Sequence, residues 1–175
     1  MPPKPLSTKP PKVKVKPHLL LTRTGKRDQH GLEILQLQRF QDGVPMGVLT
    51  AYSGGPRNQV FRRGADSKAL SNEPLPEGLW SIGDIDWAAG KDNYQASWGP
   101  GLGAAWVPIE YQAPGKTARS EIGFHLDENV ISAPGSAGCV VFRTKADLQQ
   151  FIAWLRSDDP RHLYVNWGLG SCPKP

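Results

Sequence analysis

The stretch Ile122-Gly-Phe-His-Leu126, followed by Ser136-Ala-Gly-Cys-Val-Val-Phe142, carries the most informative pattern of the 175-residue chain. His125, one of four histidines, lies in a short apolar run that is typical of a strand. Cys139, one of two cysteines, follows His125 by fourteen positions (139 − 125 = 14) and directly follows the glycine-rich loop 133–138. We therefore expect the reactive residues of the protein in this stretch.

A cysteine near a histidine indicates nucleophilic chemistry, because the thiolate is the reactive form and an imidazole can take up the thiol proton. Gly138, just before the cysteine, allows backbone N–H groups to approach closely enough to stabilise an oxyanion. Asp127 shares a strand face with His125 by the two-residue period and is a candidate to orient the imidazole. The competing interpretation is that the cysteine and the histidine are ordinary core residues.

These residues resemble the signature of the L,D-transpeptidase (YkuD-like) family of peptidoglycan enzymes. That signature is a histidine, a loop, Ser/Thr-x-Gly-Cys and a β-branched residue. The matching positions of this chain are His125, Ser136, Ala137, Gly138, Cys139 and Val140. More loosely, the resemblance extends over residues 18–168.

The resemblance implies a mainly β (β-rich α+β) fold, a small mixed β-sandwich or barrel with one packed α-helix. It also implies cysteine-dependent acyl transfer or hydrolysis at L,D-peptide bonds of peptidoglycan, without a cofactor or metal, with Ser136 and Ala137 next to the substrate. Two positions depart from the family pattern. Ala137 stands where a second histidine or a basic residue is common, and Val141 where an arginine is common. Arg143, or an arginine of the 57–63 loop such as Arg57 or Arg62, is expected to supply the missing charge.

Patterns outside this stretch agree with a β-rich domain. Alternating or β-branched segments predict strands at residues 18–24, 32–40, 46–53, 79–83, 106–111, 121–126 and 162–167. The first three are expected to form an antiparallel meander, with a hairpin turn at Asp42-Gly43. Thr144 is expected to cap a helix that ends near Pro160, and its apolar stripe is Leu148, Phe151, Ile152 and Leu155. Trp98, in a glycine-rich loop, is a candidate wall of a groove for a sugar-peptide polymer, or a cap on the sheet edge.

Composition separates a tail from the folded part. Residues 1–17 contain five lysines and no acid, and removing them leaves 16 basic residues (21 − 5 = 16) against 16 acidic ones. We therefore expect an extended Pro/Lys-rich tail (1–17), one domain (18–170) and a short C-terminal tail (171–175). The neutral domain gives no argument for nucleic-acid binding, and no apolar run is long enough to span a membrane.

The N-terminal residues lack the apolar stretch of a signal peptide. The expectation is therefore synthesis in the cytoplasm and delivery to the cell wall by a phage particle, phage lysis or an injection-type system. The alternative is a non-catalytic component of a virion or secretion assembly that docks through residues 1–17. Cys172 is expected to lie near a frayed end, incidental to function, although it could pair with Cys139 in an oxidising compartment.

Overall fold

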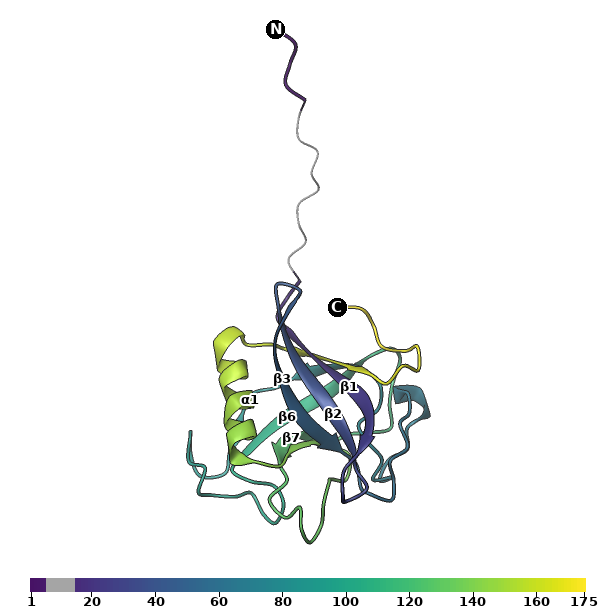
Figure 1. Cartoon of the computed structure of the whole chain (residues 1–175), viewed down its shortest axis with the longest axis vertical. Helices are drawn as coiled ribbons and strands as arrows, with labels where there is room; N and C mark the ends of the chain where they lie inside the picture. The colour runs from purple at the N-terminus through teal and green to yellow at the C-terminus, as the bar shows by residue number, and fades with distance from the viewer. Residues whose placement is uncertain (6–14) are drawn as a thin grey trace.

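The computed structural model describes residues 1–5 and 15–175, and its ordered elements begin at His18 (Figure 1). In this described part the strands are β1 (His18–Arg27), β2 (Glu33–Gln41), β3 (Val44–Ser53), β4 (Gly78–Ile82), β5 (Asp86–Trp87), β6 (Ala105–Ala113), β7 (Ile122–Leu126), β8 (Val140–Phe142) and β9 (His162–Asn166). The helices are a single 3-10 turn, η1 (Gly64–Asp66), and one α-helix, α1 (Lys145–Asp158). The protein is therefore mainly β, as predicted.

The first three strands form the predicted antiparallel meander. In its register Leu21 lies opposite Leu37, and Leu37 opposite Leu49. All three leucines are buried, because alternate side chains of each strand face the same side of the sheet. The β2–β3 turn is made by Asp42 and Gly43, both with positive φ (51° and 75°), which is the conformation that a two-residue hairpin turn requires.

The sheet closes on itself into a barrel. Its strand order is β4-β9-β1-β2-β3-β8-β7-β6-β5, and β4 pairs with β6 as well as with β9. Most neighbours are antiparallel, whereas β1 with β9 and β7 with β8 are parallel. This mixed barrel agrees with the fold class inferred from the sequence.

Helix α1 packs against β3, β7 and β8 and lies along one side of the barrel (Figure 1). It begins as predicted: the hydroxyl of Thr144 accepts a hydrogen bond from the backbone N–H of Asp147 (3.0 Å). Phe151 of its apolar stripe contacts Phe124 of β7 and Phe142 of β8, with ring centroids 4.5 Å and 4.9 Å apart. The helix thereby holds in place β7, which contains His125, and β8, which begins directly after Cys139.

Several elements differ from the sequence-based prediction. Strand β1 continues to Arg27, three residues beyond the end of the predicted strand 18–24, and pairs there with Glu33 across a register shift. The short strands β5 and β8 were not predicted, because two or three residues are too few to display an alternation.

The C-terminal end is anchored instead of frayed up to Ser171. The buried carboxylate of Glu77 accepts hydrogen bonds from the backbone N–H groups of Trp167, Leu169 and Ser171 and from the hydroxyl of Ser171. Cys172 is half-buried, and both cysteines carry free thiols. Ser171, the first residue of the predicted C-terminal tail, is thus hydrogen-bonded to the domain. Much of the predicted N-terminal tail (residues 6–14) lies outside the described residues.

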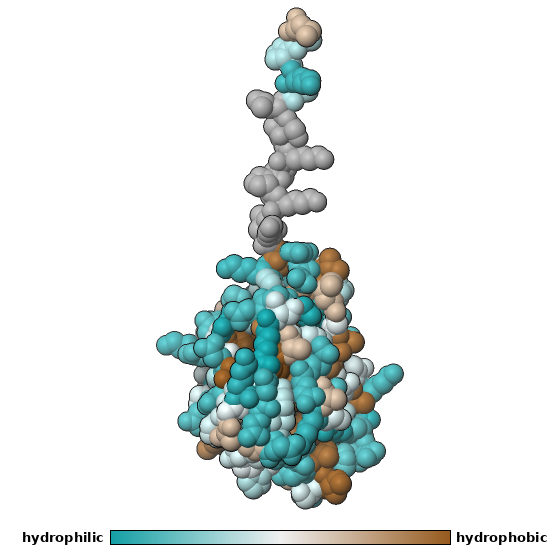
Figure 2. Space-filling view, turned by 90° about the vertical axis from the view of Figure 1, so that its left-hand side faces the viewer, coloured by the Kyte–Doolittle hydropathy of each residue, from teal (hydrophilic) through white to brown (hydrophobic). Residues whose placement is uncertain are grey.

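The molecular face in Figure 2 is largely hydrophilic, with separate hydrophobic patches. Outward-facing residues of β3, namely Val44, Met46 and Val48, are among the exposed apolar side chains. No helix of the described residues is long and apolar enough to cross a membrane.

Candidate active site

The pairing of β7 with β8 brings His125 and Cys139 into one cavity. The two strands run parallel, with Phe124 opposite Val140 and His125 opposite Val141. Cys139 directly precedes Val140, the first residue of β8. Both His125 and Cys139 line a cavity of about 720 Å³.

Ser136 holds the loop in front of the cysteine. Its hydroxyl donates to the carbonyl oxygen of Cys139 (2.7 Å) and accepts from the backbone N–H groups of Gly138 (3.2 Å) and Gly54 (3.1 Å). At the end of β3, the hydroxyl of Ser53 donates to the carbonyl oxygen of Gly138 (3.2 Å). Ser136 thus organises the loop, and the N–H of Gly138, expected to be an oxyanion donor, is already hydrogen-bonded.

The imidazole of His125 is held from two sides. Its Nδ1 lies 2.9 Å from the carbonyl oxygen of Leu126, which can only accept, so Nε2 is the basic nitrogen of the neutral ring. The indole of Trp106 stacks on the imidazole, with centroids 5.6 Å apart and an interplanar angle of 19°. Burial lowers the pKa of His125, against the opposing effect of the Leu126 and Gly101 carbonyl groups. At neutral pH the ring is therefore in the form that a general base needs.

Cys139 lines two cavities. The residue is only 9% exposed, yet it lines both the 720 Å³ cavity and a smaller one of about 250 Å³. Burial raises the pKa of the Cys139 thiol, whereas the backbone N–H of Gly123 and the charge of Arg119 lower it. Within the described residues the thiol and the imidazole are not hydrogen-bonded to each other. Such contacts often tighten only when a substrate binds.

Arg119 is the buried cation beside the cysteine. One guanidinium nitrogen, Nη2, donates to the carbonyl oxygens of Ala137 (3.2 Å) and Glu73 (3.1 Å). The other, Nη1, donates to the hydroxyls of Ser67 (3.2 Å) and Ser71 (3.4 Å) and also to the carbonyl oxygen of residue 74. These contacts occupy both terminal nitrogens. Arg119 therefore joins the 67–74 loop to the cysteine loop and supplies positive charge behind the sulfur.

Replacing Arg119 with glutamine should raise the pKa of the Cys139 thiol, because a positive charge that favours the thiolate is removed. The free energy of unfolding should also fall, by about 1–3 kcal/mol, because buried acceptors lose a charged donor. The measurements are the pH dependence of iodoacetamide alkylation, in a Cys172→Ala background, and urea denaturation. Arg62→Gln is the surface control. An unchanged alkylation profile in Arg119→Gln would exclude the electrostatic role.

Asp127 does not orient the imidazole, contrary to the expectation from strand periodicity. Its carboxylate accepts a hydrogen bond from the backbone N–H of Gly135 (2.8 Å), and the carbonyl of Leu126 occupies Nδ1 of His125. Asp127 follows the last residue of β7, so the two-residue period no longer fixes where its side chain points. Asp127 instead positions the loop that leads to the cysteine, and burial raises the pKa of its carboxyl group.

The predicted arginines do not line the cavity that contains the histidine and the cysteine. Arg143 forms an ion pair with Asp28, and its guanidinium lies 3.5 Å from the ring centroid of Tyr52. Arg62 pairs with Glu73 (2.8 Å), and Arg57 is exposed on the surface. The expected contact of these arginines with a substrate carboxylate is therefore not supported by their positions.

Of the remaining predicted substrate contacts, Ala137 lines both cavities that reach Cys139. Trp98 is not among the residues that line them; its indole N–H donates to the carbonyl oxygen of Asp86 (3.1 Å). It caps the edge of the sheet next to β5, which was the alternative interpretation.

Three residues of the site were not predicted from the sequence: Trp106, Arg119 and Glu121. Trp106 and Glu121 lie in the predicted strands 106–111 and 121–126, and Arg119 lies between these strands, where no periodicity distinguishes it. A weak signal exists for Trp106. A Cβ on Gly123 would lie 2.9 Å from the indole, so this glycine lets the ring lie flat across β7.

The described residues contain no group of three or more His, Cys, Asp or Glu side chains arranged to hold a metal ion. The arrangement that remains is a thiol and an imidazole that line one cavity, with a buried guanidinium bound to the loop that carries the thiol. Comparison with models of known protein families gave no match, and comparison with curated proteins gave none either.

Proposed function

We propose that the protein is a cysteine-dependent enzyme that cleaves or exchanges L,D-peptide bonds in the stem peptides of peptidoglycan. The observation that carries this proposal is that His125, in β7, and Cys139, directly before the adjacent strand β8, line one cavity. The cavity is large enough for a peptide segment. The sequence pattern around these two residues adds the reaction class and the substrate, through its resemblance to L,D-transpeptidases.

The first half of the reaction forms a thioester. Nε2 of His125 takes the proton of the Cys139 thiol as the sulfur attacks the carbonyl carbon, and the carbonyl electrons move onto oxygen. The N–H of Cys139 is the proposed oxyanion donor, since the N–H of Gly138 binds Ser136. The C–N bond then breaks, and the imidazolium returns its proton to the departing amine.

The second half consumes the thioester. An amine or a water molecule attacks the same carbonyl carbon while Nε2 of His125 takes its proton. The C–S bond then breaks, and the imidazolium returns the proton to the departing thiolate. An amine gives a new cross-link, whereas water gives a shortened stem peptide. The carbonyl group of Leu126 favours the imidazolium that forms in each half, which matches the role of the third group in other nucleophile–histidine sites.

The test is digestion of purified sacculi with the native protein and with Cys139→Ala, followed by mass analysis of the released muropeptides. We expect the native protein alone to change the masses at L,D bonds. Identical product profiles would reject the enzyme and favour a non-catalytic assembly component. New products from cleavage at other bonds would indicate a thiol peptidase of another class.

A further inference from the structure

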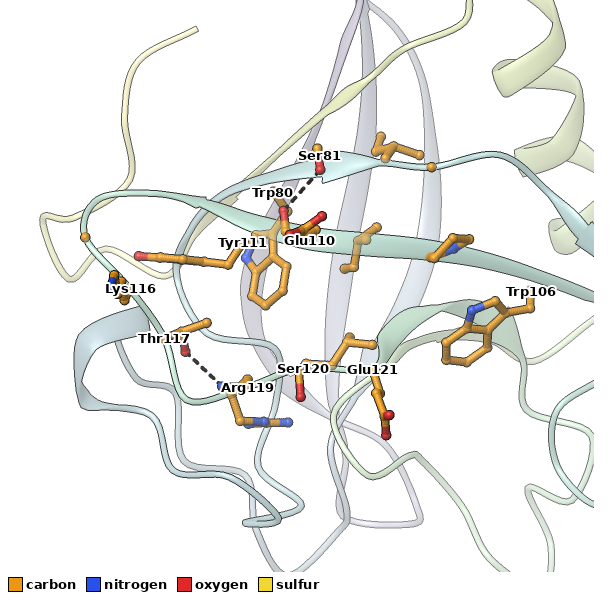
Figure 3. Close-up of a pocket in the computed structure, with 16 residues that line it drawn as sticks. Trp80, Ser81, Trp106, Glu110, Tyr111, Lys116, Thr117, Arg119, Ser120 and Glu121 are labelled. Carbon is orange, nitrogen blue, oxygen red and sulfur yellow. Dashed lines mark hydrogen bonds between the residues drawn. The ribbon is translucent and has the colours of Figure 1, made fainter.

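Three cavities meet at Glu121. It lines the 720 Å³ cavity that contains His125 and Cys139, the 250 Å³ cavity that also reaches Cys139, and a third of about 640 Å³. The third lies between strands β4 and β6 and the 115–122 segment (Figure 3). Trp106 lines this third cavity and the first. A substrate that extends from the first cavity into either of the other two therefore passes Glu121.

The charge of the 720 Å³ cavity is negative. Among the described residues that line it, Glu121 is the only lysine, arginine, aspartate or glutamate. The other polar side chains include three uncharged amides, Asn58, Asn72 and Asn129. The nearest buried cation, Arg119, directs both terminal nitrogens at the protein itself. A cavity with one carboxylate and no cation of its own favours a positively charged group.

The carboxylate of Glu121 is available for a ligand. The residue is exposed, and within the described residues no hydrogen bond or ion pair engages its side chain. Figure 3 shows this side chain pointing away from Trp80 and Tyr111, on the side of the 115–122 segment that faces away from β4 and β6.

The backbone beside the cysteine adopts an unusual conformation on both sides. Glu121 has φ of 56°, in the left-handed region that residues other than glycine seldom adopt, and so do Asn72 (56°) and Leu70 (58°). All three line the 250 Å³ cavity with Cys139. Strained backbone of this kind is concentrated at functional sites, where the surrounding structure maintains it.

We propose that Glu121 determines specificity by binding the side-chain ammonium of the substrate residue whose carbonyl group Cys139 attacks. The inference rests on the proposed function; the resemblance to L,D-transpeptidases implies that Cys139 attacks the carbonyl group at the L-centre of a diamino acid of the stem peptide. The ammonium donates to the Glu121 carboxylate, and the amide side chains of the cavity supply further acceptors. The site thereby selects a diamino acid with a free side-chain amine, and it does so without an arginine contact to a carboxylate.

The experiment compares two soluble muropeptides that differ only in acetylation of that amine. We expect the native protein to have about tenfold or higher kcat/KM on the free amine, since one charge-assisted hydrogen bond is lost on acetylation. Glu121→Gln should abolish this preference, mainly through KM. Glu121→Lys should prefer a substrate succinylated at the same amine. Glu110→Gln is the matched control, because Glu110 lines only the 640 Å³ cavity; it should behave as the native protein.

The outcomes separate the two proposals. If the native protein turns over neither muropeptide, the proposed function fails. If it turns over both equally, or if Glu121→Gln keeps the preference for the free amine, the function stands and the assignment of Glu121 is wrong. In Glu121→Gln we expect an unchanged circular dichroism spectrum and an unchanged pH profile of thiol alkylation. If this variant loses activity and its alkylation profile shifts, Glu121 does not act through substrate binding.

Discussion

Replacing His125 with glutamine should lower kcat/KM at L,D bonds by about 10²- to 10⁴-fold, the usual contribution of a positioned general base. Glutamine is similar in length and can still donate to the carbonyl group of Leu126, but it accepts no proton near neutral pH. The loss should therefore fall on kcat, with little change in KM. Stopped assays on a soluble muropeptide, with mass detection, measure both constants.

The pH dependence gives a second measure of the same residue. The pKa of His125 is lowered by burial, so the native protein should stay active at a pH below the ordinary histidine value of about 6.5. Stability should behave in the matching way. As pH falls through that value the unfolded chain binds a proton first, so the native protein loses stability there. The His125→Gln variant should lack this loss of stability at low pH. If His125→Gln keeps a near-native kcat, His125 is not the general base.

Replacing Gly138 with alanine should damage both folding and activity. A Cβ at this position would lie 1.7 Å from Nη2 of Arg119, and φ is +131°, which side chains other than hydrogen rarely permit. The guanidinium cannot move away without losing its bond to Ala137. Overpacking and backbone strain together should cost about 2–5 kcal/mol. Urea denaturation measures this loss, and thiol alkylation reports whether the cysteine loop has shifted.

Gly90 provides the matched control for that substitution. It also has a positive φ (+98°), but a Cβ there would meet no atom within 4 Å. Gly90→Ala should therefore report the cost of the backbone conformation alone. If both alanine variants lose the same free energy of unfolding, the approach of the added Cβ to Arg119 contributes nothing to the loss at Gly138.

The sequence predicted elements whose signals are local. The helix at residues 145–158 follows from a cap at Thr144 and an apolar stripe, and the meander follows from alternation and a glycine turn. The participation of Arg119 and Glu121 was not predictable in this way. Their positions depend on the closure of the barrel, which carries the 115–122 segment to the cysteine loop, and no local pattern records that contact.

Asp127 illustrates the opposite failure, in which a valid local rule was applied one residue too far. The two-residue period holds within β7, but the strand ends at Leu126. Beyond that point the side chain follows the turn and binds Gly135. The prediction that arginines of the 57–63 loop contact a substrate carboxylate failed for another reason. A sequence shows the charge of a residue, but it does not show the partner that neutralises this charge.

The lateral hydrogen bonds between β7 and β8 have a consequence for protein engineering. They set the separation of base and nucleophile, so the thirteen residues between them (139 − 125 − 1 = 13) need not do so. The anchor points at Asp127, Gly135, Ser136 and Gly138 must be kept. The exposed portion around Ile131 can then be lengthened or exchanged, which makes it a suitable place to graft new selectivity without rebuilding the reactive pair.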